Sequence, residues 1–310
     1  MSEKYIKVNG IELAYDEFGD QHNPVILLVM GLGTQMIAWP EDFCNGLAGN
    51  GYRVIRFDNR DIGLSQKMEG AQIPKMLWVA ARARLHLPVS VPYTLHDMAR
   101  DTICLLDALD IETVHLVGAS MGGMIAQLVA SHHPFRVLSL TSIMSTSGRK
   151  SLPGAEAKIA LHMLRRPTSR DEKTIEDYAM RTWGLIGSPA YPPSDAALRD
   201  KISQSYQRSY YPAGNARQMA AILASGDRTT ELAQIQAPTL VIHGKQDPLV
   251  PVEGGIDTAR LIPGAKLELI DGMGHDLPAV LLPHFVELIS SHAAEAVNHL
   301  QPSEGADSAA

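Results

Sequence analysis

Two patterns of apolar residues alternate along the chain, and their alternation predicts the fold. Short apolar runs of strand length are separated by longer stretches in which apolar residues recur at the helical period. The predicted strands are residues 5–8, 11–18, 24–30, 52–58, 114–117, 137–144, 239–243 and 266–270, and the predicted helices are residues 41–49, 94–109, 124–133, 252–261 and 279–299. Strands that alternate with helices indicate an α/β fold with a mostly parallel, doubly wound sheet covered by helices on both faces.

The alternation stops near residue 147 and resumes near residue 231. Between these points the pattern is helical and is interrupted by several prolines. We therefore predict a core made of residues 1–147 and 231–300, with residues 148–230 inserted as a helical cap. The last residues, 301–310, are small and polar and are expected to form a disordered tail.

Composition and charge narrow the class of protein. The 310 residues are 45% hydrophobic and 20% charged, which is typical of a soluble globular protein. The formal net charge is −7 and no run of lysines or arginines is present, which argues against a nucleic-acid partner. The N-terminus lacks an apolar signal segment and no stretch holds 18 consecutive apolar residues, so we expect a cytoplasmic protein without a membrane span. Cys44 and Cys104 lack metal-ligand spacing and are expected to be buried thiols rather than a structural disulfide.

A Gly-x-Ser-x-Gly motif at residues 118–122 stands between a predicted strand and a predicted helix. A chain that reverses within so few residues forces the central residue, Ser120, into a strained backbone conformation, and the flanking glycines leave room for the turn. The serine hydroxyl is thereby raised above the sheet at a helix N-terminus, where developing negative charge is favoured. The motif predicts that Ser120 is a nucleophile.

A serine nucleophile needs a base, and an imidazole base needs a carboxylate to hold its tautomer. In a doubly wound sheet such groups lie at the carboxyl ends of later strands. Asp247 follows the strand at 239–243, and His275 follows the strand at 266–270. The chain order serine, aspartate, histidine is that of α/β-hydrolases, so we predict Ser120, Asp247 and His275 as the catalytic residues.

Other residues compete for these roles. Asp247 could instead be an ordinary turn residue before a proline, and His275 an ordinary surface histidine. Asp271 and Asp276 are nearer to His275 in the sequence, but neither ends the preceding strand, so both rank below Asp247. His243 precedes the acid and is expected to have a supporting structural role. Several other histidines are expected to be exposed helix residues: His132, His133, His284, His292 and His299.

An acyl-transfer reaction also needs donors for the oxyanion of its tetrahedral intermediate. The N–H of Met121 comes from the serine turn itself. The second donor is expected from the loop after the strand at 24–30, where Gly31-Leu32-Gly33 lets the backbone approach closely, and we choose the N–H of Leu32. The alternative is that these glycines only permit a tight turn.

Three motifs together resemble the α/β-hydrolase superfamily over nearly the whole chain, from Tyr5 to His299. Residues 118–123 resemble the Ser-Met-Gly-Gly turn that is common in its esterases, perhydrolases and C–C hydrolases. Residues 243–251 are similar to the acid loop of the superfamily, and Gly274-His275 is similar to its histidine loop. The resemblance implies the α/β-hydrolase fold.

Two positions depart from the pattern of the superfamily. Asp61 replaces a glycine in the turn at 58–65, which the resemblance makes structural rather than catalytic. Met30-Gly31 replaces His-Gly at the end of the strand at 24–30, so an orienting hydrogen bond is lost while backbone donation is kept. Met30-Gly31 followed by Trp39-Pro40 resembles a subgroup that includes aclacinomycin methylesterase-like enzymes.

The resemblance implies a carboxylic ester hydrolase that acts through an acyl-enzyme. A C–C hydrolase or perhydrolase with the same triad, or a ligand-binding receptor of this fold with little turnover, is the alternative. The chain has no dinucleotide fingerprint, P-loop or His-Glu-x-x-His motif, so no cofactor or metal is expected.

Apolar residues of the cap are expected to line the pocket for the acyl group, and Trp183 and Tyr210 are the predicted substrate-binding residues. The expected partner is therefore a neutral, moderately hydrophobic small-molecule ester, since a charged acyl group would have to lose its water. Arg165 and Arg181 are the first candidates for a cationic anchor if charged esters are preferred instead. The oligomeric state stays open.

Overall fold

The computed structural model describes residues 3–85, 87, 89–164 and 167–300. The predicted tail at 301–310 and the candidate anchor Arg165 lie outside these residues. Within them, eight strands form one sheet in the order β1-β2-β4-β3-β5-β6-β7-β8. The strands are β1 Lys4–Val8, β2 Ile11–Phe18, β3 Val25–Val29, β4 Arg53–Phe57, β5 Val114–Ala119, β6 Val137–Ile143, β7 Thr239–Gly244 and β8 Lys266–Ile270.

The sheet is parallel from β4 to β8 and antiparallel at its N-terminal edge. β1 pairs with β2, and β2 pairs with β4, in antiparallel register, whereas all later pairs are parallel. Asn9 and Gly10 make the β1–β2 turn with φ angles of 46° and 78°. Two consecutive positive φ angles are typical of a type I′ hairpin turn, which matches the twist of the flanking strands.

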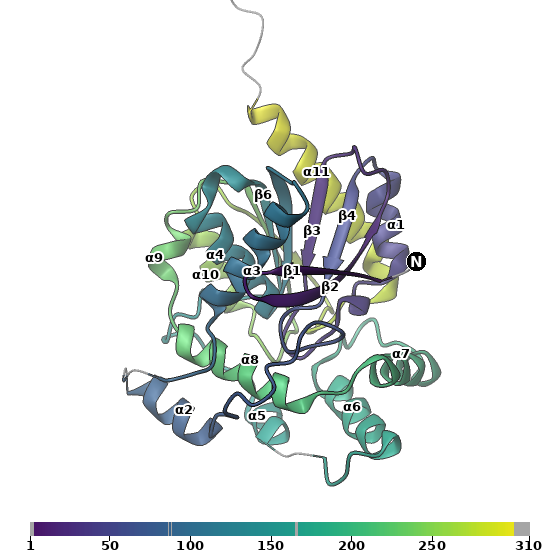
Figure 1. Ribbon diagram of the computed structural model, residues 1–310, viewed down its shortest axis with the longest axis vertical. Coiled ribbons are helices and arrows are strands. Elements are labelled where there is room, and N and C mark those ends of the chain that lie inside the picture. Colours follow the sequence, from purple (N-terminus) through teal and green to yellow (C-terminus); the bar gives the residue numbers. More distant parts are fainter. Residues whose placement is uncertain (1–2, 86, 88, 165–166, 301–310) are drawn as a thin grey trace, which may run out of the picture.

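Helices cover both faces of the sheet (Figure 1). On one face α3 and α4 bury apolar residues against the strands, with Leu261 of α10 partly buried beside them, and on the other face α1 and α11 do so. β3, β5 and β7 are buried along their whole length, as expected for strands covered on both sides. The core helices are α1 Glu41–Gly49, α3 Leu95–Ala108, α4 Met121–His132, α10 Glu253–Leu261 and α11 Leu282–Leu300. α9 Thr229–Leu232 lies at the boundary between the predicted cap and core, and short 3₁₀ turns are η1 Met36–Ala38, η2 Pro134–Arg136 and η3 Ala279–Leu281.

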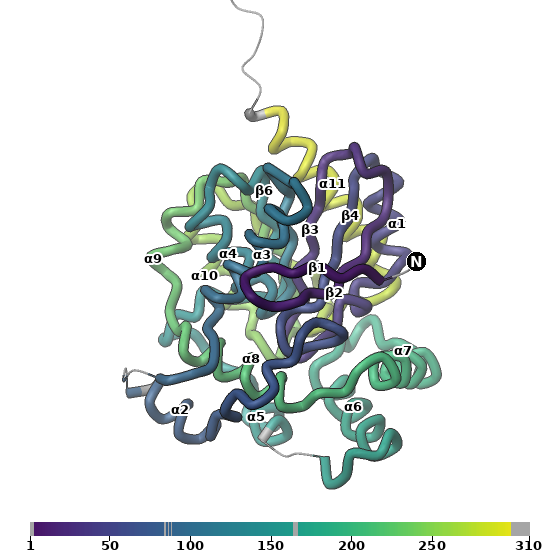
Figure 2. Tube along the Cα trace, in the orientation of Figure 1, coloured from purple at the N-terminus to yellow at the C-terminus, as the bar shows by residue number. Residues whose placement is uncertain are grey.

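A second group of helices gathers at one end of the sheet, in the lower part of Figure 1. These helices are α2 Met76–Arg84, α5 Ala157–Leu164, α6 Glu172–Ile186, α7 Asp195–Arg208 and α8 Pro212–Ser225. Figure 2 follows the chain as it leaves the sheet after β6 and returns before β7. The two crossing points are joined, because the N–H of Arg228 donates to the carbonyl of Ser147 at 2.9 Å.

These contacts support the division of the chain that we propose, with residues 148–230 as a cap on a core of residues 1–147 and 231–300. One element of the first core segment lies with the cap in space, since α2 packs against α8 rather than on the sheet. The prolines and alanines of residues 66–92 do not reveal this placement in the sequence. None of the helices in the described part of the chain combines the length and apolar character needed to span a bilayer.

The prediction that His292 is exposed is wrong. Its side chain is only 5% exposed, and its Nε2 lies 3.2 Å from the carbonyl oxygens of Leu140 and Pro238. The reason is that α11 packs across β6, so the helix face that carries this histidine turns toward the sheet. Burial lowers the pKa of His292, which keeps the buried imidazole neutral.

Candidate active site

Ser120 lies at the turn between β5 and α4. Its φ of 55° and ψ of −118° place it in a region that residues with a side chain rarely adopt. The turn is held because the Ser120 N–H donates to the carbonyl of Ile143 on β6 at 2.9 Å. A Cβ atom on Gly122 would lie 2.0 Å from the carbonyl oxygen of Val29, so only glycine fits there. The helix begins at Met121, directly after the serine and three residues earlier than predicted.

The structure brings Ser120, His275 and Asp247 into one hydrogen-bonded chain. His275 Nε2 lies 3.0 Å from Ser120 Oγ, and His275 Nδ1 lies 2.6 Å from Asp247 Oδ2. Asp247 follows β7 and His275 follows β8, so both lie at the carboxyl edge of the sheet near the end of β5. With Nδ1 protonated, His275 donates to Asp247 and its Nε2 can accept the serine proton.

Asp247 is held as a carboxylate by its surroundings. Burial opposes its ionisation, but the charge of His275, the neighbouring imidazoles and the N–H of Val250 outweigh burial and lower its pKa to about 2. The N–H groups of Leu249 and Val250 donate to Oδ1 at 2.9 and 2.8 Å, which leaves Oδ2 for His275. His243 lies behind the acid, donating from Nε2 to the Val250 carbonyl at 2.8 Å.

The two competing aspartates are engaged elsewhere. Asp271 is exposed and pairs with Lys245 at 2.9 Å. Asp276 accepts hydrogen bonds from the N–H and the hydroxyl of Ser188, and burial raises its pKa. Neither carboxylate is bonded to the His275 ring in the described structure, so the geometry favours Asp247 as its partner.

The predicted oxyanion donors border Ser120. β3 and β5 are neighbours in the sheet, so the loop after β3 lies beside the serine turn. A Cβ atom on Gly31 would lie 3.6 Å from Ser120 Oγ, which shows how closely this loop passes. Among the described residues, no acceptor is bonded to the N–H of Leu32 or of Met121. Two backbone donors beside the hydroxyl are therefore left for another acceptor.

Cap residues reach the same loop, and sequence reasoning missed them. Gln218 on α8 accepts from the N–H of Gly33 at 2.8 Å and donates to the carbonyl of Arg60 at 2.9 Å. Gln35 donates to the carbonyl oxygens of Ser205 and Ser209. No motif marks these residues, because polar side chains on a predicted helix are more often solvated.

The turn at 58–65 also connects the core to the cap. Asp58 accepts the N–H of Met36 at 2.7 Å and pairs with Arg208 of α7 at 2.7 Å. Asp61, which stands where the superfamily has glycine, has a φ of 70° and pairs with Arg217 of α8 through both carboxylate oxygens. A positive φ explains why glycine is usual at this position, and aspartate tolerates that conformation better than most residues.

The two predicted substrate-binding residues lie at different places in the cap. Trp183 is half-buried on α6, and the same helix supplies the Ile186 carbonyl that accepts the N–H of His275 at 2.7 Å. Tyr210 follows α7 and packs against Tyr206, with ring centroids 5.5 Å apart. Trp183 is thus one helical turn from a residue that contacts His275, whereas the ring contact of Tyr210 is within the cap.

Lys201 is a cationic residue near the site that sequence reasoning missed. Its ammonium group lies 5.8 Å from the centre of the Trp183 ring. Water reaches the side chain, yet the surrounding protein desolvates the ammonium and lowers its pKa, with Asp276 opposing the shift. Arg181, the expected candidate anchor, is exposed on α6.

The sequence matches the family described as the alpha/beta hydrolase fold over residues 24–279. The chain belongs to this family. Rhodomycin D methylesterase DauP of Streptomyces sp. (strain C5) is 27% identical to this alpha/beta hydrolase, over 96% of this chain and 99% of that protein. The 2-hydroxy-6-oxononadienedioate/2-hydroxy-6-oxononatrienedioate hydrolase of Paraburkholderia xenovorans (strain LB400) is also 27% identical, over 86% of this chain and 84% of that protein.

A solved structure shows the same fold. The meta-cleavage product hydrolase from Pseudomonas fluorescens IP01 superimposes with a TM-score of 0.73 and 20% identity, covering 94% of this chain and 98% of that one. The predicted α/β fold with a mostly parallel sheet is confirmed, and so is the resemblance to the superfamily.

Proposed function

We propose that this alpha/beta hydrolase cleaves carboxylic esters through an acyl-enzyme on Ser120. The observation that carries the proposal is the chain of contacts from Ser120 Oγ to His275 Nε2 at 3.0 Å and from His275 Nδ1 to Asp247 at 2.6 Å. These are the distances that a nucleophile, its base and an orienting carboxylate need.

In this mechanism His275 takes the hydroxyl proton as Ser120 attacks the ester carbonyl, and it then protonates the leaving alcohol. Asp247 stabilises the imidazolium that forms, and its low pKa keeps it ionised for that purpose. A water molecule, deprotonated by the same imidazole, then hydrolyses the acyl-serine and regenerates the hydroxyl.

The N–H groups of Leu32 and Met121 are the proposed oxyanion donors. Both are unbonded in the described structure and border the serine hydroxyl, and the Met121 N–H is also at the N-terminus of α4. The positive end of the helix dipole adds to the stabilisation of negative charge. Each such donor typically contributes about 3–4 kcal/mol in the transition state.

The relatives support ester cleavage and name one alternative. The methylesterase aligns over nearly all of both chains, whereas the hydrolase of Paraburkholderia xenovorans covers less of each. A C–C hydrolase reaction on the same three residues is therefore the second candidate.

The electrostatics beside His275 support a neutral substrate. Burial raises the pKa of Asp276 and lowers that of Lys201, so both shifts favour the uncharged forms. The half-buried Trp183 lies against Lys201 and adds an apolar surface. We therefore propose neutral, moderately hydrophobic esters as substrates, with Trp183 and Tyr210 as binding residues of the cap.

The test is hydrolysis of p-nitrophenyl esters by the purified protein and by two serine variants. Ser120→Ala should lower kcat by about 10⁴–10⁶ while the circular dichroism spectrum is unchanged. Ser131→Ala is the matched control, because Ser131 is a buried serine on the same α4 helix whose hydroxyl has no partner among the described residues. It should keep the activity of the wild type.

The outcomes separate the candidates. If Ser120→Ala keeps even a tenth of the activity, the nucleophile is wrong. Slow ester turnover with rapid cleavage of a vinylogous 1,5-diketone would favour the C–C hydrolase. Tight binding of esters with negligible product would indicate a ligand-binding receptor of this fold.

A further inference from the structure

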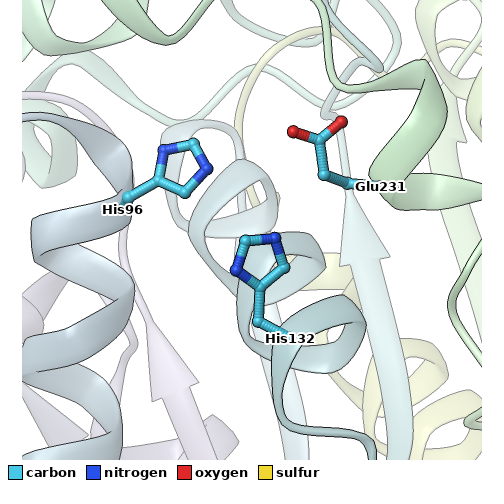
Figure 3. A group of neighbouring side chains, drawn as sticks. All are labelled: His96, His132 and Glu231. Carbon is cyan, nitrogen blue, oxygen red and sulfur yellow. The ribbon is translucent and has the colours of Figure 1, made fainter.

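A group of three metal-ligating side chains lies on the helices that cover one face of the sheet. His96 is in the first turn of α3, His132 is the last residue of α4, and Glu231 is in α9. One ligand atom from each lies within 4.8 Å of the other two. Figure 3 shows the two imidazoles and the carboxylate facing a common space from three separate helices.

Among the described residues, charged groups act on two of these side chains only at longer range: Arg228 and Asp97 on His96, and Arg228 on Glu231. In this part of the chain no hydrogen bond or salt bridge joins the His96, His132 or Glu231 side chain to another residue, and the contacts found are those within the group. The rings of His96 and His132 lie 5.5 Å apart and tilted by 46°, so they do not stack on each other. Their nitrogen atoms are therefore available to an added ligand.

The three helices that carry these side chains pack against one another or are anchored in the core. α4 packs against both α3 and α9. Leu232, next to Glu231, is fully buried, and its N–H donates to the carbonyl of the buried Arg228 at 2.9 Å. Ligands carried on packed helices are held more precisely than ligands on loops, which lowers the entropy lost when an ion binds.

We propose that His96, His132 and Glu231 bind one divalent transition-metal ion, with Zn²⁺ as the best fit. Two imidazoles and one carboxylate are a ligand set that suits Zn²⁺, Ni²⁺, Co²⁺ and Cu²⁺, whereas Mg²⁺ and Ca²⁺ prefer oxygen ligands alone. Tetrahedral Zn²⁺ with bonds of about 2.0–2.1 Å needs ligand atoms roughly 3.4 Å apart. Small side-chain rotations bring atoms now within 4.8 Å to that spacing, and water completes the coordination.

The site is remote from the proposed chemistry. His132 ends the helix that begins beside Ser120, and its twelve residues separate the two by roughly 17 Å. The ion would instead join three helices. α9 lies where the chain returns from the cap to the sheet. The bound ion therefore links this segment of the chain to α3 and α4.

The test is titration of the untagged, chelator-treated protein with ZnCl₂ by isothermal titration calorimetry. One ion per chain should bind the wild type, and His96→Ala, His132→Ala and Glu231→Gln should each weaken binding at least tenfold. His284→Ala is the matched control, because His284 is an exposed helix histidine whose Nδ1 lies 4.0 Å from Glu287, and no group of three ligands among the described residues includes it. This variant should bind as the wild type does, and MgCl₂ should give no binding.

The melting temperature provides a second readout. Zn²⁺ should raise it in the wild type and in His284→Ala but not in His132→Ala, because an ion that binds only the folded state stabilises it. Circular dichroism checks that the variants fold. The proposal would be overturned if the wild type bound Zn²⁺ with a dissociation constant above about 1 mM. Equal binding by His132→Ala would also overturn it. Ester hydrolysis is not a readout here, so the two proposals fail independently.

Discussion

At the scale of single residues, the environment of each group decides its role. Ser120 is held at a positive φ by a hydrogen bond to a neighbouring strand, and Asp247 is kept ionised inside the protein by His275 and by two backbone N–H groups. Asp271 has the same side chain but stays in solvent beside Lys245. Chemical type alone does not distinguish these two carboxylates.

Asp247→Asn should make the free energy of unfolding depend less on pH in the acid range. The pKa of Asp247 is lowered from 3.8 to about 2 in the folded protein, so its contribution is fully present above pH 4 and is lost as pH falls toward 2. The difference in unfolding free energy between wild type and variant should shrink by about 2 kcal/mol across that window. Urea unfolding from pH 6 to pH 2 measures it, and a constant difference would contradict the assignment.

Asp247→Asn and His275→Ala should each impair ester turnover, and the double variant should lose far less than the sum. The two residues act on the same proton through one hydrogen bond, so removing either disables the other. A kcat measurement on the two single variants and the double variant tests this. Fully additive losses would mean that the two side chains do not work as a unit, and full activity of Asp247→Asn would move the acid role to another carboxylate.

At the scale of elements, two largely buried ion pairs join the proposed cap to the core. Arg208 of α7 and Arg217 of α8 reach Asp58 and Asp61 in the turn after β4. Burial opposes ionisation of Asp61, but the hydrogen bonds of Arg217, Met68 and Tyr93 outweigh it and lower its pKa. The aspartate at this family glycine position therefore has a partner from the inserted segment.

Arg217→Met should destabilise the protein by about 3–5 kcal/mol, because it leaves the Asp61 carboxylate buried without a counter-charge. Adding Asp61→Asn removes that charge and should restore a large part of the loss. Urea unfolding of the single and double variants measures the effect. The control is Arg199→Met, at an exposed ion pair within the cap, which should change stability little. A double variant less stable than Arg217→Met would refute the explanation.

At the scale of the whole molecule, we propose that the cap controls which substrates reach Ser120. The sheet carries the three proposed catalytic residues, whereas α6 and α7 carry Trp183 and Lys201. Substrate preference should therefore follow residues of the inserted segment, and the chemistry should follow residues of the core.

Neutral esters should have a higher kcat/KM than esters of equal length that carry a terminal carboxylate on the acyl chain. A carboxylate on the acyl chain must lose its water near His275, which costs free energy that a neutral ester does not pay. Steady-state kinetics on the matched series tests this. Equal or better rates for the carboxylates would contradict it. Loss of those rates in Lys201→Met, but not in the control Lys173→Met at an exposed lysine of α6, would make Lys201 the anchor.

The sequence by itself determined the order of strands and helices in the core. Buried parallel strands need continuous apolar runs, so β3, β5 and β7 stand out, and the tight turn at Ser120 requires glycine at fixed positions. These are local requirements, and a pattern along the chain records them. The chain order of Ser120, Asp247 and His275 followed in the same way from strand ends.

The tertiary structure alone decided what lies opposite each residue. Four features depend on packing between elements that are distant in sequence. They are the contact of α2 with α8, the burial of His292 against β6, the pairing of Asp61 with Arg217, and the grouping of His96, His132 and Glu231. Polar residues on a helix show the same pattern whether they face solvent or another helix. Their partners are determined only when the helices pack, so no spacing in the sequence predicts them.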